Sequence, residues 1–181
     1  MSKQQTQFVI LCEDTQQEVC VRHFLLERGV HRRKIRVRKN PKGRGAGEQF
    51  VRELYSLEVR EYRRRSTYQT VALVAVMDAD TRTVANSMSW LDQMLVDDFQ
   101  QQRSADERIA LLVPKRNIET WIQYFKTDVA DENEIYPGLN RAGDCKIDVQ
   151  RFAKTDCFNN LPATAPPSLH SACDELWKIL A

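Results

Sequence analysis

The sequence predicts an α/β fold in which a largely parallel four-stranded sheet is layered between helices. Apolar runs at 7–12, 70–77 and 108–113 are short and rich in β-branched residues, which is typical of strands buried on both faces. Segments long enough for crossover helices separate these runs, which favours parallel pairing. The composition, 42% apolar and 29% charged over 181 residues, suits a globular chain with its own core.

The first strand, 7–12, is followed by a helix that we expect from about Thr15 to Arg28. Thr15 is placed to cap this helix, with Glu18 three residues later completing a capping box. Gly29 supplies the stop, because glycine readily adopts the left-handed backbone that ends many helices. These elements form the first strand and helix of the layered fold.

A short strand at 34–38 alternates two apolar residues with basic ones, as expected of an edge strand with one face exposed to solvent. The glycine-containing loop 40–47 then leads into a helix over about 48–65. Its expected buried stripe includes Phe50, Val51, Leu54, Leu57, Val59 and Tyr62.

The strand at 70–77 leads into a helix over about 83–101, and the fourth strand, 108–113, leads into a helix capped by Asn117. Four strands alternating with helices complete the predicted sheet.

The last third of the chain is more polar and richer in turns. It contains a short amphipathic helix at 146–154 and a closing amphipathic helix for which Ser168 is the expected cap. We therefore divide the chain into an α/β core, 1–127, and a small helical C-terminal subregion, 128–181, packed on that core.

Neither membrane insertion nor secretion is expected. No stretch approaches the roughly 18 consecutive apolar residues of a membrane span, and the N-terminus lacks an apolar signal core, so a cytoplasmic location is the expectation. The five cysteines are odd in number and form no CxxC pair, which argues against a disulfide framework or a structural zinc ribbon. Most of them should be small buried apolar residues.

Acidic residues follow two of the buried strands. Glu13 comes directly after the first strand, and Asp78 and Asp80 come after the third. Ligands of open α/β sheets gather where such strands end, and three carboxylates there repel one another unless a cation or a proton lies among them. Oxygen ligands suit Mg²⁺ or Mn²⁺, so the sequence predicts a divalent metal site. The competing interpretation is that Asp80 merely caps the next helix.

The segment after the fourth strand adds charges to the same rim of the sheet. Lys115 and Arg116 can neutralise a phosphate or a developing oxyanion. Glu119, in the first turn of the following helix, either joins the metal shell or simply favours the helix dipole.

A basic tract covers residues 31–65, which hold 13 lysines and arginines against 4 glutamates, although the whole chain has a net charge of only +2. Such a tract attracts phosphates, and a solvated face is the alternative. Aromatic residues do not interleave its basic core, which favours recognition of the nucleic-acid backbone. The expected phosphate contacts are Arg36, Arg38, Lys42 and Arg44, with Arg116 from the other segment.

Several enzyme classes find no support. A GK[ST] sequence at Walker spacing is missing, which disfavours a nucleoside triphosphatase, and a GxSxG nucleophile motif is missing as well. The three histidines are scattered without ligand spacing.

The order of a strand ending in Glu13, a helix, a second strand and helix, and a strand ending in the Asp78–Asp80 DxD resembles the TOPRIM domain. Topoisomerases, bacterial primases, OLD-family nucleases and a ribosomal-RNA maturase share that domain. The segments GRGAGEQF and PKRNIETW are most similar to small stand-alone bacterial proteins of the RloB-like kind, often linked to phage defence. One departure is that Asp14 stands where the family usually has glycine.

The resemblance implies magnesium-dependent phosphodiester chemistry, with Glu13 as acid/base or metal ligand and Asp78 and Asp80 as ligands. The leading expectation is a Mg²⁺- or Mn²⁺-dependent nuclease of DNA or RNA with Glu13, Lys115 and Glu119 in catalysis. The alternatives are a non-catalytic nucleic-acid-binding subunit, which could dock on a separately encoded ATPase, and a nucleotidyl transferase or primase-like enzyme.

Overall fold

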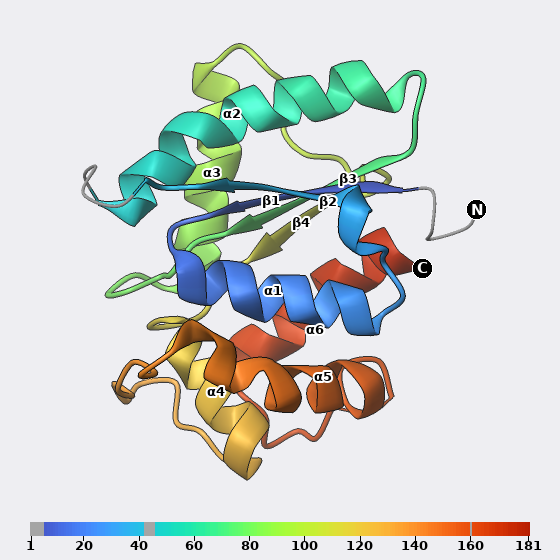
Figure 1. The fold of residues 1–181 in the computed structure, drawn as a ribbon. Coiled ribbons are helices and arrows are strands. Elements are labelled where there is room, and N and C mark those ends of the chain that lie inside the picture. The colour runs from blue at the N-terminus through green and yellow to red at the C-terminus, as the bar shows by residue number, and fades with distance from the viewer. Residues whose placement is uncertain (1–5, 42–45, 160) are drawn as a thin grey trace.

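The computed structural model describes residues 6–41, 46–159 and 161–181. It contains a four-stranded sheet between layers of helices, as Figure 1 shows. All strands run parallel in the order β2-β1-β3-β4, which confirms the predicted α/β class. The strands are β1 (Gln7–Cys12), β2 (Ile35–Lys39), β3 (Val71–Val76) and β4 (Ile109–Leu112).

Six α-helices cover the two faces of this sheet. They are α1 (Thr15–Glu27), α2 (Gly47–Ser66), α3 (Val84–Asp97), α4 (Ile118–Thr127), α5 (Lys146–Thr155) and α6 (Pro167–Leu180). Two short 3₁₀ helices are η1 (Arg32–Lys34) and η2 (Ala142–Cys145). Helices α2 and α3 pack on one face, and α1, α4, α5 and α6 pack on the other (Figure 1). None of the described helices has the length and apolarity needed to cross a bilayer.

The strand order reverses direction between β1 and β3. From β1 the chain passes through α1 to β2 on one side, whereas from β3 it passes through α3 to β4 on the other. Open α/β sheets bind ligands in the crevice that such a reversal leaves at the carboxyl ends of the strands. The register pairs Leu11 with Ala75, so Glu13 and Asp78 leave the sheet at nearly the same level. The fold therefore brings these acids to the crevice.

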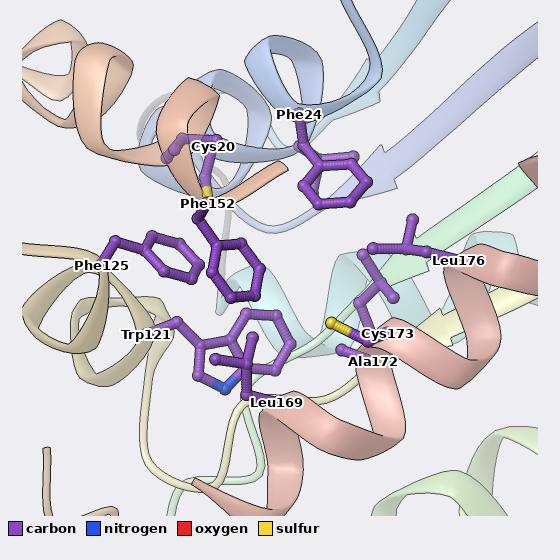
Figure 2. A pocket seen from close by; sticks show the side chains of 12 residues that line it. Cys20, Phe24, Trp121, Phe125, Phe152, Leu169, Ala172, Cys173 and Leu176 are labelled. Carbon is purple, nitrogen blue, oxygen red and sulfur yellow. The ribbon is translucent and has the colours of Figure 1, made fainter. Parts of the chain in front are cut away.

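The core on the α1 face gathers around Phe152 of α5. Its ring stacks on Phe125 of α4, with 4.4 Å between ring centroids, and meets Phe24 of α1 at 6.3 Å. Figure 2 shows these rings around a cavity of about 20 Å³ that also touches Trp121 and Cys173. About 10–15 Å³ holds one water molecule, and the lining is apolar, so this cavity is a packing gap.

Helix α6 covers β4, the edge strand at one end of the sheet. Glu175 of α6 accepts a hydrogen bond from the Leu111 backbone N–H at 2.9 Å and pairs with Arg103 and Lys178. Burial raises the pKa of Glu175, but the Lys178 and Leu111 hydrogen bonds and the Arg103 charge outweigh it and lower the pKa overall. Part of the 128–181 segment thus supplies a hydrogen-bond acceptor to the edge of the sheet.

Two helix starts differ from the sequence prediction. The cap of α1 is Asp14, whose carboxylate accepts the Gln17 N–H at 2.8 Å, and Thr15 is already helical. Helix α6 begins at Pro167, so Ser168 is inside the helix rather than its cap. Its hydroxyl instead accepts the Trp121 indole N–H at 2.9 Å, because α4 packs against this turn.

The buried stripe of α2 also differs from the prediction. Tyr55 is fully buried, whereas Leu57 is 48% exposed. The stripe follows Val51, Tyr55, Val59 and Tyr62, a spacing of three to four residues that faces the sheet.

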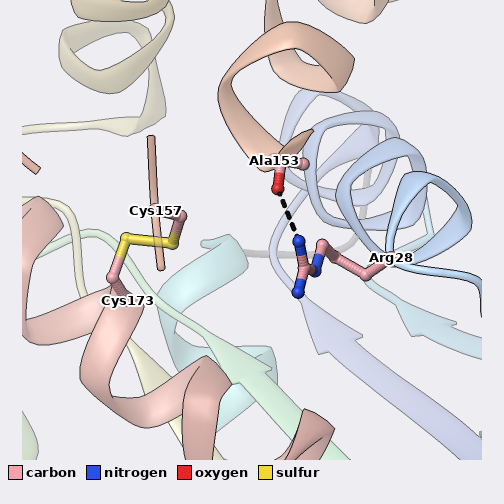
Figure 3. The surroundings of a disulfide bond; sticks show 4 residues. All are labelled: Arg28, Ala153, Cys157 and Cys173. Atoms are coloured by element: carbon pink, nitrogen blue, oxygen red, sulfur yellow. Dashed lines mark hydrogen bonds between the residues drawn. A yellow bond between two sulfur atoms is a disulfide. The ribbon is translucent and has the colours of Figure 1, made fainter. Parts of the chain in front are cut away.

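The expectation about disulfides is wrong for one pair of cysteines. Cys157, just after α5, is bonded to Cys173 of α6 across 16 residues of sequence, as Figure 3 shows. Cys12, Cys20 and Cys145 are free and buried, as predicted. Disulfides are typical of oxidising compartments, so the cytoplasmic location stays a prediction.

Reducing the Cys157–Cys173 bond should lower the free energy of unfolding by about 3 kcal/mol. The reason is that the unfolded chain gains conformational entropy when the bond no longer closes a loop of this length. Urea denaturation of the wild type with and without dithiothreitol measures the difference. A Cys157→Ala, Cys173→Ala double variant should match the reduced protein and should not respond to the reductant. Equal midpoints for the oxidised and reduced wild type would contradict this expectation.

Candidate functional site

The site begins with a hydrogen bond between residues far apart in sequence. Glu13, directly after β1, accepts the backbone N–H of Asp78 through Oε1 at 2.7 Å. The two strands lie side by side and parallel, so the chain segments that follow them meet at the crevice. The sequence prediction that these acidic residues converge thus agrees with the placement of Glu13 and Asp78.

Gln17 of α1 links the same two residues and was missed by sequence reasoning. Its side-chain oxygen accepts the Glu13 N–H at 2.9 Å, and its side-chain nitrogen donates to Asp78 Oδ1 at 3.0 Å. The residue is fully buried. A polar side chain on the sheet-facing side of α1, one turn after the strand, is the signal that could have identified it.

Asp80 does not cap the following helix. The cap of α3 is Thr83, whose hydroxyl accepts the Asn86 N–H at 3.1 Å. Asp80 has a left-handed backbone, with φ of 52°, and its N–H donates to the Arg116 carbonyl at 3.1 Å. For a non-glycine residue such a conformation costs of order 1 kcal/mol and is concentrated at functional sites.

The chain just after Asp80 is fastened to α2. Arg82 pairs with Glu48 of α2 at 2.9 Å and lies over the Trp90 ring of α3, 4.3 Å from its centroid. Arg52 of α2 lies over the same ring at 3.5 Å. These contacts hold the loop 77–83, which contains Asp78 and Asp80 and is called the aspartate loop below, against the beginning of α2.

Gly47, the first residue of α2, lies directly against Glu13. A Cβ atom at this position would lie 2.7 Å from Glu13 Cβ, 3.1 Å from Oε2 and 3.2 Å from Cα. Only glycine allows this approach, because one of the crowded atoms belongs to the backbone. The start of α2 is thus a wall of the site.

Two carboxyl groups at the crevice, those of Glu13 and Asp78, are shifted toward the protonated form. Burial is the main cause that raises the pKa of Glu13 to about 7. The hydrogen bonds from Asp78 and Gln17 lower this pKa, and the charges of Asp80 and Asp14 raise it. Burial also raises the pKa of Asp78, with the charge of Glu13 adding to it.

Glu119 of α4 belongs to the same electrostatic group. Burial raises its pKa, its own backbone N–H lowers it, and the charge of Asp14 raises it further. Its charge in turn raises the pKa of Asp78. Acidic side chains are therefore concentrated at one place on the rim of the sheet.

The donor chemistry of this group fits a hard divalent cation. The side chains of Glu13, Asp78 and Asp80 offer only oxygen atoms, which Mg²⁺ and Mn²⁺ prefer. Within residues 6–41, 46–159 and 161–181, no three histidine, cysteine or acidic side chains form a ready-made metal-ligand group.

Two cations lie beside the acids. Lys115 and Arg116 precede α4, are partly exposed, and have no ion-pair partner among the residues that the structure describes. Asn117 follows them at the N-cap position of α4 but makes no side-chain capping bond. The backbone contact between Asp80 and Arg116 places these cations next to the aspartate loop.

The basic tract contributes less free charge than its sequence implies. Arg38 pairs with Glu58 of α2 at 2.9 Å, and Lys39 pairs with Glu18 of α1 at 2.7 Å. Arg36 is exposed on the edge strand β2. The predicted contacts Lys42 and Arg44 lie outside the described residues.

Comparisons with protein-family models, with curated proteins and with solved structures find no match. The functional argument therefore depends on the geometry and charge of the site and on the sequence resemblance.

A Gly47→Ala variant should lose about 1–3 kcal/mol of unfolding free energy, because its Cβ atom overlaps Glu13. Urea denaturation measures the loss. Gly143→Ala is the matched control, since no atom lies within 4 Å of its added Cβ. Equal losses in the two variants would show that Gly47 is not tightly packed on Glu13.

Glu13→Gln should be more stable than the wild type at pH 8, with the difference vanishing below about pH 4.5. The pKa of Glu13 rises from 4.5 to about 7 on folding, so the folded state binds the proton more tightly and the wild type loses stability as pH rises through this window.

Thermal melts from pH 4 to pH 8 in EDTA measure this difference in stability. Glu134→Gln, on an exposed loop, is the control and should track the wild type. A Glu13→Gln variant that is no more stable than the wild type at pH 8 would contradict the raised pKa.

Proposed function

We propose that the protein is a Mg²⁺- or Mn²⁺-dependent phosphodiesterase that cleaves nucleic acid. The observation that carries the proposal is the Glu13–Asp78 hydrogen bond at the reversal of strand order, which holds two partly buried acidic residues together where the strands end. Buried acids with raised pKa values in a cleft are characteristic of functional sites. The TOPRIM resemblance of Glu13, Asp78 and Asp80 points to the same chemistry.

Glu13, Asp78 and Asp80 would hold the cation. When bound, it would supply a Lewis acid that makes water more nucleophilic and offsets negative charge on the phosphate. Gln17 orients the ligands, because its two hydrogen bonds fix Asp78 Oδ1 and the Glu13 backbone. Partners of this kind typically contribute 10–100-fold to metal affinity or activity.

The cationic side chains have a separate role in this proposal. Lys115 and Arg116 bind the phosphate of the substrate, since both are free of ion pairs within the described residues and stand beside Asp80. Glu119, whose pKa is raised by burial, is the candidate for proton transfer. Arg36 extends the contact with the nucleic-acid backbone along the edge of the sheet.

Asp78→Asn should reduce Mn²⁺-dependent cleavage of plasmid and single-stranded substrates at least 100-fold, and Gln17→Leu should reduce it 10–100-fold. Product formation on gels with purified protein measures both rates. Asp174→Asn, an exposed acid on α6, is the control and should cleave at the wild-type rate.

Equal cleavage by the wild type and Asp78→Asn would contradict the catalytic assignment. If neither protein cleaves but both bind nucleic acid, and Arg36→Ala reduces the salt dependence of binding, the non-catalytic alternative holds instead. Incorporation of labelled nucleotides would identify a nucleotidyl transferase.

A further inference from the structure

A cavity of about 260 Å³ lies between α4 and the loop that precedes η2. Its lining combines apolar and hydrogen-bonding side chains. They include Glu119, Ile122, Lys126, Tyr136, Leu139 and Asn140. The cavity is separate from the apolar packing gap around Phe152.

Glu119 joins this cavity to the acidic site. Its carboxyl group lines the cavity, and its charge also acts on Asp78. Gly138 of the loop faces it, since a Cβ atom there would lie 3.9 Å from Glu119 Oε1. Glu119 is thus the residue that the cavity and the acidic site share.

One wall of the cavity is a fixed aromatic ring. The Tyr136 hydroxyl accepts the Asp131 N–H at 2.8 Å, which anchors the ring from its far end. Ile122, only 2% exposed, and Leu139 provide apolar surface. A flat, partly apolar group fits such a lining.

The polar part of the lining offers donors and acceptors together. The Asn140 amide has one of each, and in the described part of the chain neither it nor the Lys126 ammonium has a side-chain hydrogen bond or ion pair. Glu119 and Asp144 are acidic, which disfavours a phosphate inside the cavity. A neutral group with a hydrogen-bonding edge is therefore favoured.

We propose that this cavity binds a nucleobase of the substrate strand, next to the phosphate held at the acidic site. The inference rests on the proposed function and extends it by naming what flanks the scissile phosphate. The volume is just below the roughly 300 Å³ at which small-molecule pockets begin, so it takes a single base. Tyr136 supplies a π-face for stacking, and Asn140 contacts the edge of the base.

The test uses a fluorescein-labelled hexanucleotide and the same sugar-phosphate chain with every base removed, both titrated by fluorescence anisotropy in EDTA. The wild type should bind the base-bearing strand about tenfold more tightly than the abasic strand, the scale of one stacked base. Absence of such a preference in the wild type overturns the proposal.

Gly138→Leu fills the cavity from an exposed loop position where a Cβ atom makes only ordinary contact. This variant should bind the base-bearing and abasic strands with nearly equal affinity, while its affinity for the abasic strand stays that of the wild type. Asn140→Ala, an exposed truncation, should lower the preference several-fold, and Gly143→Ala should retain it. Retention of the full preference by both Gly138→Leu and Asn140→Ala overturns the proposal.

These outcomes are distinct from those of the cleavage assay. A base preference lost in Gly138→Leu, without any Mn²⁺-dependent cleavage, supports the cavity and rejects the nuclease. Asp78-dependent cleavage without a base preference rejects the cavity alone.

Discussion

The hydrogen bond from the Asp78 N–H to the Glu13 carboxylate is the constraint on which the rest of the site depends. It forms only because β1 and β3 are adjacent, parallel and in a register that ends both strands together. Burial keeps the acceptor poorly solvated and raises its pKa to about 7. The neighbouring acids repel one another, and Gln17 and the start of α2 hold them in place despite that repulsion.

Much of this arrangement could be predicted from the sequence, because it follows from strongly patterned segments. Runs such as 71–76 can hardly be anything but strands buried on both faces, and helices of crossover length between them favour parallel pairing. Once the strands are parallel, acids that follow them must lie at one rim. The edge position of β2 was likewise readable from its alternating basic residues.

What could not be predicted depends on contacts between distant segments. Asp14 and Thr15 are both good capping residues, and only the backbone conformation decides between them. The Cys157–Cys173 pairing needs the segment after α5 to lie against α6. The sequence suggests more unpaired positive charge in the basic tract than the structure has. Two of its side chains form ion pairs with Glu58 of α2 and Glu18 of α1, which only the folded arrangement brings close. Gln17 carries no motif of its own, and its role appears only when Asp78 is placed beside it.

The contact of Glu175 with β4 has a consequence for assembly. Its carboxylate occupies a backbone donor that an incoming strand would otherwise use, so the sheet cannot grow on that side without displacing α6. The opposite border is β2, which carries the exposed Arg36. A second copy of the chain that paired edge to edge with β2 would bring its own Arg36 to the same border, and this like charge disfavours edge-to-edge aggregation.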